Sequence, residues 1–572
     1  MTSSAPTPPF HYASLNELRD RLGNTLVEDG RLKPEELKIL LQRSEWRKQS
    51  LESLLVTEKY LSEEQLVQTF ASITGLPVLK NTETLVDNEA VSSVPPGAAL
   101  RYRIMPLQRE NSCLILASDH PRDPDEIAEL MVILGYSLQW KLCTAREITG
   151  LIKHFYGVGL APFLQLRESE TRTHQAGRRN ETGTGIPDFI DALIREAIQS
   201  NASDIHIEPQ EDTVVVRYRI DGVLHNVPLP EGVNAYQKAI ISSIKVMANL
   251  DIADRRMPQD GRIEKKLDEE SFDIRISVLP TRMGETVELR LLNREDTFLG
   301  IDELGLASWQ RKKIQRLIQL PHGLLLFTGP TGSGKTTSQY AVLAEANDSK
   351  RKIITIEDPV EYQVKGITQL QTHAEIGFTF AHGLRSVLRH DPDIILVGEI
   401  RDDETARIAV GAALTGHLVL STLHTNDSAG SAPRLIDMGI EPYLVASSLQ
   451  GIISQRLVRS ICPHCKQQKT LEDDFLEEVQ SLFPESTPPY TTRAGCGCPY
   501  CRFTGYQNRR ALFELMEITD PLRSLIAERS SSPVLMQQAI KQGMTPLRQA
   551  GWELVLNGHT TLEELLRITG GG

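Results

Sequence analysis

Three segments in the middle of the chain alternate strictly between apolar and polar positions. They are residues 216–220, 272–278 and 287–291, and each places an apolar side chain at every second residue. Such alternation predicts strands of a sheet with one buried and one exposed face. Arg275 and Arg290 occupy exposed positions. A sheet face that carries several arginines fits either ordinary surface charge or contact with a phosphate.

Short apolar runs separated by helix-compatible stretches follow further along the chain. These runs are Leu324 to Phe327, Ile353 to Ile356, Ile394 to Val397 and Leu418 to Leu420. The spacing predicts a parallel sheet flanked by helices. Ligand chemistry in such sheets lies at the carboxyl ends of the strands. We therefore expect an α/β domain with its site along that edge.

The first of these runs leads directly into a glycine-rich segment that fits G-x4-G-K-[ST]. A helix-compatible stretch, Thr337 to Ala346, follows the glycines. Strand, glycine loop and helix together predict a cradle for nucleotide phosphates, because backbone N–H groups and the helix N-terminus attract an anion. Lys335 is expected to reach the β- and γ-phosphates of ATP, and the Thr336 hydroxyl to hold Mg²⁺. The expected nucleotide-binding residues are Gly329, Pro330, Thr331, Gly332, Ser333, Gly334, Lys335, Thr336 and Thr337.

Polar side chains follow the next three apolar runs. Glu357 and Glu361 come after the second run and Glu399 after the third. A carboxylate in the position of Glu399 can reach the Mg²⁺ shell or polarise an attacking water. His417 and His424 bracket the fourth run. An isolated histidine is usually structural, whereas two around a strand end could sense the γ-phosphate.

Two C-x2-C pairs, Cys462/Cys465 and Cys498/Cys501, predict a closed tetrahedral zinc site. The alternative is a set of reduced cysteines in a surface loop. Cys496 could compete as a ligand, and His464 is interpreted as a bystander. Cys113 and Cys143 lie in apolar surroundings and are expected in the core.

Composition and periodicity suggest several domains. Leu26-Val27-Glu28 and Leu55-Val56-Thr57 begin two similar helical segments, so the first domain is a helical repeat. The expected divisions are a disordered start (1–11), the helical repeat (12–78), a mixed α/β domain (79–157), a linker (158–185), the arginine-bearing α+β domain (186–300) and the ATPase core (301–572), with the cysteines in an element at 459–510.

Net charge and hydropathy narrow the function. The net charge of −13 and 5% aromatic content argue against broad nucleic-acid binding. The first ten residues do not resemble a signal peptide, and no apolar run approaches the 18 or so residues of a membrane span. We expect a cytoplasmic protein that reaches the inner membrane through partners.

Four segments together resemble a known family. Residues 329–336, 354–362, 389–402 and 415–425 are similar to the Walker A motif, Asp box, Walker B motif and His box of the secretion ATPase superfamily. Residues 203–209, 258–262 and 455–459 and the pair Gly505-Tyr506 are further matches, more narrowly to the assembly ATPases of type II secretion and type IV pili. The resemblance is specific from residue 187 onward and weaker before that.

The resemblance implies a RecA-like core in a homo-hexameric ring, with nucleotide between this core and a preceding α+β (PAS-like) domain. Arg275 and Arg290 match the arginines that reach the γ-phosphate, and Glu399 matches the catalytic Walker B carboxylate. Glu357 and Glu361 match its Asp-box partners. The four cysteines match the zinc element of assembly-type members, which favours assembly over retraction. The implied partners are a membrane platform protein and cytoplasmic-docking proteins.

Several alternatives stay open. Residues 434–443 favour type II secretion over a type IV pilus. Residues 505–509 depart from the usual Gly-Tyr-Arg-Gly-Arg, which we interpret as a change in a surface turn. Arg21, Leu22 and Gly23 resemble a cyclic di-GMP motif, but the second copy has Ser50, Glu52 and Lys59 where Arg and Gly are expected, so a helical docking domain is favoured. A RecA-like nucleic-acid motor and a non-hydrolysing ATP sensor are the remaining classes.

Overall fold

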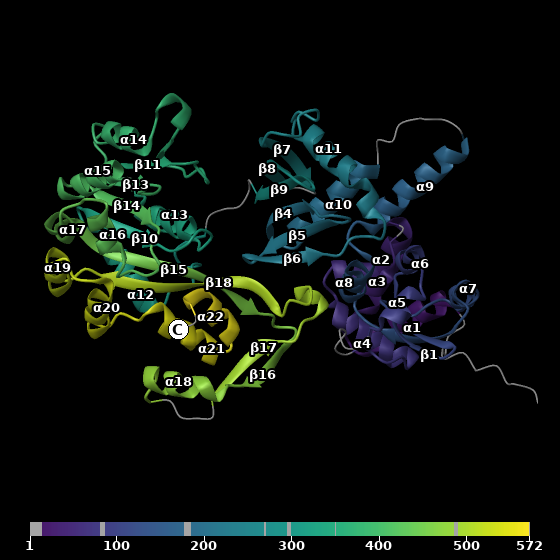
Figure 1. Cartoon of the computed structure of the whole chain (residues 1–572). Helices are drawn as coiled ribbons and strands as arrows, with labels where there is room; N and C mark the ends of the chain where they lie inside the picture. Colours follow the sequence, from purple (N-terminus) through teal and green to yellow (C-terminus); the bar gives the residue numbers. More distant parts are fainter. Residues whose placement is uncertain are drawn as a thin grey trace, which may run out of the picture. The chain divides into compact units, whose positions relative to one another are not determined.

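A computed structural model of the chain shows two compact units (Figure 1). The first comprises Met1–Arg294 and Cys496–Gly505, and the second Glu295–Gly495 and Tyr506–Gly572. The structure describes residues 14–47, 49–79, 86–176, 185–267, 270–293, 299–348, 350–485 and 490–570. The expected disordered start at 1–11 lies outside the described residues.

The first unit begins with the helical repeat. Its helices are α1 (Leu15–Glu28), α2 (Pro34–Arg47), α3 (Leu51–Thr57) and α4 (Glu63–Thr74). The backbone hydrogen bonds after α1 recur after α3: Arg31 and Leu32 donate to the Leu26 carbonyl, and Tyr60 and Leu61 donate to the Leu55 carbonyl. Gly30 (φ 69°) and Lys59 (φ 63°) hold the same left-handed position. These paired turns confirm the internal repeat.

A mixed α/β segment follows. Its elements are α5 (Asn88–Ser92), α6 (Pro96–Arg101), β1 (Ile104–Glu110), β2 (Cys113–Ser118), α7 (Pro124–Leu134), β3 (Ser137–Leu142) and α8 (Ala145–Tyr156), with a sheet in the order β1-β2-β3. Cys143 is buried, as expected, whereas Cys113 is only partly covered. The expected linker is partly wrong, because α9 (Leu160–Ala176) occupies much of it. Phe163 and Leu166 are buried and tie this helix to the core.

The rest of the first unit is an antiparallel sheet. Its elements are α10 (Gly185–Gln199), β4 (Ala202–Pro209), β5 (Val214–Ile220), β6 (Val223–Val227), the 3₁₀ turn η2 (Val233–Tyr236), α11 (Gln237–Met247), β7 (Gln259–Leu267), β8 (Glu270–Thr281) and β9 (Gly284–Asn293). The strand order is β6-β5-β4-β9-β8-β7. The apolar residues of 272–278 are all buried and Arg275 is exposed, which confirms the alternation predicted for this strand.

The second unit contains the expected parallel sheet, extended by three further strands. Its first elements are α12 (Ser308–Leu317), β10 (Gly323–Thr328), α13 (Lys335–Ala346), β11 (Ile353–Glu357), β12 (Thr368–Gln371), the 3₁₀ turn η3 (Ala374–Ile376), α14 (Phe380–Val387), β13 (Ile394–Val397), α15 (Asp403–Leu414), β14 (Leu418–Leu423), α16 (Ser431–Asp437), α17 (Pro442–Ser448) and β15 (Leu449–Ile461). The strand order is β12-β11-β13-β14-β10-β15-β18, and only β18 (Tyr506–Glu517) is antiparallel to its neighbour.

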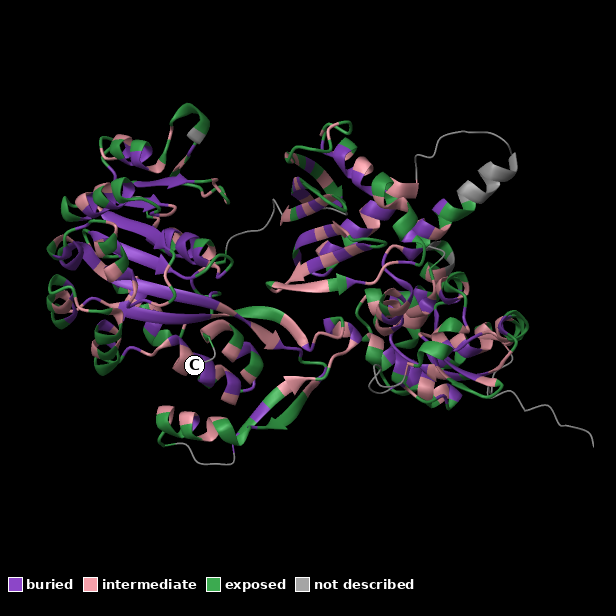
Figure 2. Cartoon of the chain, viewed as in Figure 1, coloured by how far each residue is buried: buried purple, intermediate pink, exposed green. Residues whose placement is uncertain are grey.

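Both faces of this sheet are covered. Leu324 and Leu326 pack into one apolar core, and Leu325 and Phe327 pack into a second core with residues of α12 and α13. Strands β10, β11, β13 and β14 are therefore buried along their whole length, as Figure 2 shows. Continuous apolar strands are typical of a sheet with helices on both sides.

The remaining elements are β16 (Lys466–Thr470), the 3₁₀ turn η4 (Asp473–Phe475), α18 (Leu476–Leu482), β17 (Thr491–Gly495), the 3₁₀ turn η5 (Pro499–Cys501), α19 (Asp520–Ala527), α20 (Ser532–Lys541), α21 (Leu547–Leu556) and α22 (Leu562–Thr569). Strands β16 and β17 pair as an antiparallel ribbon. None of the described helices combines the length and the apolar character of a membrane span.

The repeat turn at Lys59 yields a stability test. Lys59→Gly should stabilise α3 and the following turn by about 1 kcal/mol, because glycine adopts the left-handed backbone without a Cβ clash. Hydrogen exchange at the amides of Tyr60 and Leu61 measures this local stability. The matched control is Glu58→Gly, where φ is −84° and glycine should destabilise the turn. Faster exchange in Lys59→Gly would contradict the assignment.

Candidate active site

The glycine loop between β10 and α13 is packed closely against β15. Gly329, Gly332 and Gly334 have φ values of 143°, 77° and 83°. A Cβ at Gly329 would lie 2.5 Å from the Gln455 carbonyl oxygen and 2.7 Å from the Ser333 Oγ. A side chain there is excluded by contact as well as by backbone conformation. The glycines therefore allow a tight loop that ends at the N-terminus of α13.

Lys335 lies inside this loop and is buried. Its Nζ donates to the carbonyl oxygens of Gly329, at 2.8 Å, and Pro330, at 3.0 Å. Burial lowers the pKa of the ammonium, and the negative charge of Glu399 acts against that shift. The carbonyl oxygens of the loop thus hold the lysine side chain. A bound phosphate would have to replace these carbonyls as the hydrogen-bond partners of Lys335.

A pocket of about 520 Å³ lies over the loop. Of the residues expected to bind nucleotide, Thr331, Gly332, Ser333, Gly334, Lys335, Thr336 and Thr337 line it. Gly329 and Pro330 do not line the pocket, and contribute the carbonyls that hold Lys335. Glu357, Glu361 and Glu399 also line it, so the predicted carboxylates and the phosphate loop share one site. This agrees with the expectation that polar groups gather at the carboxyl ends of the strands.

Glu399 is the carboxylate with the strongest ties to the pocket's other charged groups. His424 Nε2 lies 3.2 Å from Glu399 Oε2, and Arg401 forms an ion pair with the other carboxylate oxygen. The Glu399 side chain retains 17% exposure. The carboxylate is thus oriented by two neighbours and still accessible to a small molecule in the pocket.

The two histidines lie at opposite ends of β14. His424 follows the carboxyl end of the strand and lines the pocket, whereas His417 precedes the amino end. The ring of His417 contacts the Ala412 carbonyl oxygen at 3.0 Å. The expectation that both histidines sense one phosphate therefore does not fit, since the strand holds them apart by its own length.

Glu357 is held in a buried hydrogen-bond network. One oxygen accepts from the Tyr340 hydroxyl, and the other accepts from Thr355 at 2.5 Å and from Gln369 at 3.3 Å. Gln369 also donates to the Tyr362 carbonyl at 2.8 Å. Tyr340 belongs to α13, the helix that follows the phosphate loop. The network therefore joins that helix to the loop carrying the exposed Glu361.

Tyr340, Arg401 and Arg509 are among the lining residues that the sequence did not predict. Arg509 was placed in a surface turn, but β18 carries it to the pocket. The sequence signal was weak, because β18 reaches this sheet only by pairing with β15, and that pairing is antiparallel and distant in sequence. The segment that departs from the family pattern, residues 505–509, therefore includes a residue that lines the pocket.

The expected arginines form a cross-strand row on the sheet of the first unit. Arg219, Asp204, Arg290, Arg275 and Arg262 are successive register partners across β5, β4, β9, β8 and β7. Asp204 accepts from Arg290 at 2.8 Å, and Asp273 pairs with Arg262. Among the described residues, Arg275 has no ion-pair partner. Like charges on adjacent strands are unfavourable, so this row suits an external anion.

The four predicted cysteine ligands form one pair in each unit, with Cys462 and Cys465 in the second unit and Cys498 and Cys501 in the first. Cys462, Cys465 and Cys501 are buried. The Cys498 and Cys501 sulfurs are 3.7 Å apart, close to the roughly 3.8 Å edge of a tetrahedron with Zn–S bonds of about 2.3 Å. The amides of Cys498 and Gly505 donate to the Cys501 sulfur, which favours a thiolate. Cys496, the competing candidate, is exposed.

These features define a P-loop nucleoside triphosphatase with a parallel-sheet core. Residues 180–567 match the family model described as "Type II/IV secretion system protein", and residues 74–162 match the MshEN domain. The chain belongs to the type II/IV secretion system protein family.

Two relatives match along almost the whole chain. The type IV pilus assembly ATPase PilB of Myxococcus xanthus is 37% identical, over 96% of this chain and 99% of the relative. The type II secretion system protein E of Xanthomonas campestris pv. campestris is 38% identical, over 96% and 98%. That of Pseudomonas aeruginosa is 48% identical, over 67% and 75%. Near-equal identity to a secretion protein and a pilus protein does not separate these two roles.

The Glu357 network predicts a split between binding and turnover. Tyr340→Phe removes one hydrogen-bond donor to the buried Glu357 carboxylate. This change should lower the local stability of the network by about 1–3 kcal/mol. We expect kcat for ATP to fall about ten-fold and the Kd of a fluorescent ATP analogue to change less than about three-fold. Tyr443→Phe, at an exposed position of α17, is the matched control. Unchanged kcat in Tyr340→Phe would show that the network does not order the site.

Proposed function

We propose that this chain powers the assembly of a pilus-like fibre in a type II secretion system by hydrolysing ATP. The chain is an ATP hydrolase of its family. One observation carries the mechanism: Lys335 and Glu399 face the same pocket, and Glu399 is oriented by His424. A non-hydrolysing sensor would not need an oriented carboxylate opposite its phosphate loop.

The residues divide the reaction among them. The backbone N–H groups of the loop and Lys335 would bind the β- and γ-phosphates. Thr336 would hold Mg²⁺, which supplies charge neutralisation on the phosphates when bound. Glu399 would orient the attacking water and accept its proton, and His424 would hold Glu399 in position. Glu361 and the network of Glu357 would shape the wall beside the phosphates.

Arg275 supports a site completed by a second chain. Its guanidinium is exposed and, in the part of the chain that the structure describes, has no carboxylate partner. Arg290 is also exposed but is shared with Asp204 and Glu288. We infer that Arg275, aided by Arg290, stabilises the γ-phosphate charge in a homo-hexameric ring. The α+β domain that presents both arginines would be the PAS-like domain of the family.

The second candidate is assembly of a type IV pilus, supported by the full-length match to a pilus ATPase. In either role the chain would act in the cytoplasm and reach the inner membrane through a platform protein and a docking protein. The test uses a bacterium that has both machines. The gene for each motor is deleted in turn, and this chain is expressed in each deletion strain. Restored export without restored pili supports secretion, and the reverse result supports the pilus.

The helical repeat is proposed as a docking element rather than a dinucleotide site. Glu52 stands where the second motif copy should carry glycine, and it forms an ion pair with Arg19 at 3.3 Å. Arg21 is paired with Glu17 at 2.6 Å. A carboxylate in this place repels a phosphate, which disfavours cyclic di-GMP.

We propose zinc for the four cysteines, because two C-x2-C pairs, one of them with sulfurs 3.7 Å apart and backbone N–H donors to Cys501, suit a closed structural site. Cys462→Ser should reduce zinc from one ion per chain to none and lower the thermal stability of the 459–510 element. Zinc is measured by elemental analysis of the purified chain. Cys496→Ser is the control and should keep full zinc. A full complement of zinc in Cys462→Ser would refute the ligand set.

The ring mechanism predicts concentration-dependent activity. ATP hydrolysis per chain should rise with the fraction of a hexamer-sized species, measured by light scattering on the same samples. Arg275→Gln should lower kcat about 100-fold without preventing ring formation. The control is Arg282→Gln, at an exposed position near the β8–β9 turn. Full specific activity in a monomer would contradict the ring mechanism.

A further inference from the structure

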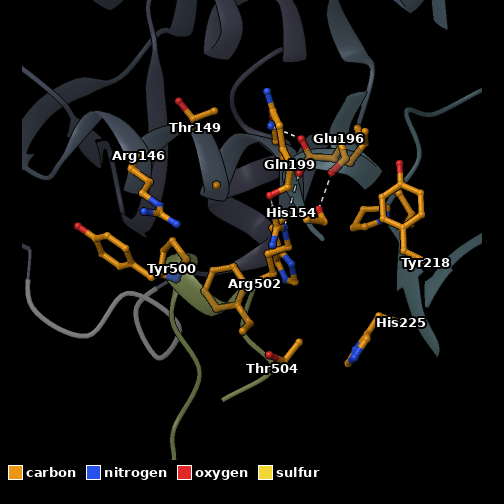
Figure 3. Close-up of a pocket in the computed structure, with 18 of the residues that line it drawn as sticks. Arg146, Thr149, His154, Glu196, Gln199, Tyr218, His225, Tyr500, Arg502 and Thr504 are labelled. Carbon is orange, nitrogen blue, oxygen red and sulfur yellow. Dashed lines mark hydrogen bonds and ion pairs between the residues drawn. The ribbon is translucent and has the colours of Figure 1, made fainter. Parts of the chain in front are cut away.

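A second large pocket lies entirely within the first unit. Its volume is about 510 Å³, in the range of small-molecule sites. One wall is a face of α8 that carries Arg146, Thr149, Lys153 and His154. The end of α10 and strands β5 and β6 form the other walls together with residues 499–504. Figure 3 shows Arg146 and Tyr500 on one side and Tyr218 and His225 on the opposite side. None of these residues lines the nucleotide pocket.

The pocket carries more positive than negative charge. Its cations are Arg103, Arg146, Lys153 and Arg502, and its carboxylates are Glu63 and Glu196. Glu196 is buried and serves two cations, since it pairs with Lys153 and lies 3.7 Å from Arg502. Arg103 is paired with Asp119 at 2.7 Å. This surplus of cations, in a chain of net charge −13, favours an anionic ligand in the pocket.

Arg146 is the cation available to a ligand. Its guanidinium lies 4.8 Å from the ring centroid of Tyr500, and no described carboxylate lies within ion-pair distance of it. Glu63 accepts from the backbone amide of Arg146, at 3.0 Å, rather than from its side chain. The guanidinium therefore keeps its planar set of N–H donors, which suits a phosphate. Figure 3 shows it directed into the pocket.

Aromatic rings supply the rest of the chemistry. The ring centroids of His154 and Phe503 lie 4.5 Å apart, and both residues line the pocket with Tyr500 and Tyr218. Val158, Ile220 and Val227 add apolar wall. Flat rings beside an arginine favour a planar heteroaromatic ring, which stacks without demanding one hydrogen-bond pattern.

We propose that this pocket binds a small phosphorylated molecule with a planar heteroaromatic ring, of the size of a mononucleotide. Arg146 binds the phosphate, and the rings of Tyr500, Phe503 and His154 contact the planar part. The bound molecule touches α8 and residues 499–504 together, so its binding stabilises the contact between them. This site is separate from the ATP site, and the inference does not depend on the proposed function.

The test uses full-length protein with Lys335→Ala, which weakens the ATP site. The four ribonucleoside 5′-monophosphates are titrated by isothermal calorimetry, alongside adenosine and ribose 5-phosphate. We expect at least one monophosphate to bind at least about ten-fold more tightly than either fragment. If no monophosphate binds, or if ribose 5-phosphate binds as tightly, the proposal is overturned.

Two substitutions place the ligand in the pocket. Arg146→Gln should weaken the best monophosphate about ten-fold or more, and Arg146→Lys should weaken it less. Arg101→Gln, at an exposed arginine of α6 outside the pocket, is the matched control and should bind normally. Equal affinity in Arg146→Gln and the control would contradict the placement. Protection of the α8 amides from hydrogen exchange by the ligand is a second readout.

Discussion

The contact between the phosphate loop and strand β15 is the constraint on which the catalytic unit depends. Gly329 must lie against the Gln455 carbonyl oxygen, and that approach leaves no room for a side chain. Because the loop is fixed there, its carbonyls hold Lys335 and α13 begins at the right place. The contact between the loop and β15 thus fixes the position of Lys335 within the pocket.

The parallel sheet brings the carboxylates to the same edge. Strands β11 and β13 pair in parallel, and Glu357 and Glu399 lie at or just after their carboxyl ends. Burial of both sheet faces makes these strands rigid, so the two carboxylates keep their spacing. Tyr340 then links α13 to Glu357. A phosphate bound at the N-terminus of α13 would therefore contact a helix that is hydrogen-bonded to the Asp-box segment.

Much of the fold could be predicted from periodicity. Alternation found β5, β8 and β9, and apolar runs found β10, β11, β13 and β14. The linker was misjudged because residues 160–176 are polar at their C-terminal end, although Phe163 and Leu166 are buried. Arg509 and Tyr340 were missed because their places depend on tertiary contacts. His417 was misplaced because bracketing a strand does not bring its two ends together.

The central claim is that neighbouring chains complete each nucleotide site, and mixing two inactive variants tests it most directly. Glu399→Gln chains keep Arg275, and Arg275→Gln chains keep Glu399. The account predicts that each is inactive alone and that an equal mixture regains activity at roughly a quarter of its interfaces. Mixtures that stay inactive at every ratio, while forming mixed rings, would contradict it.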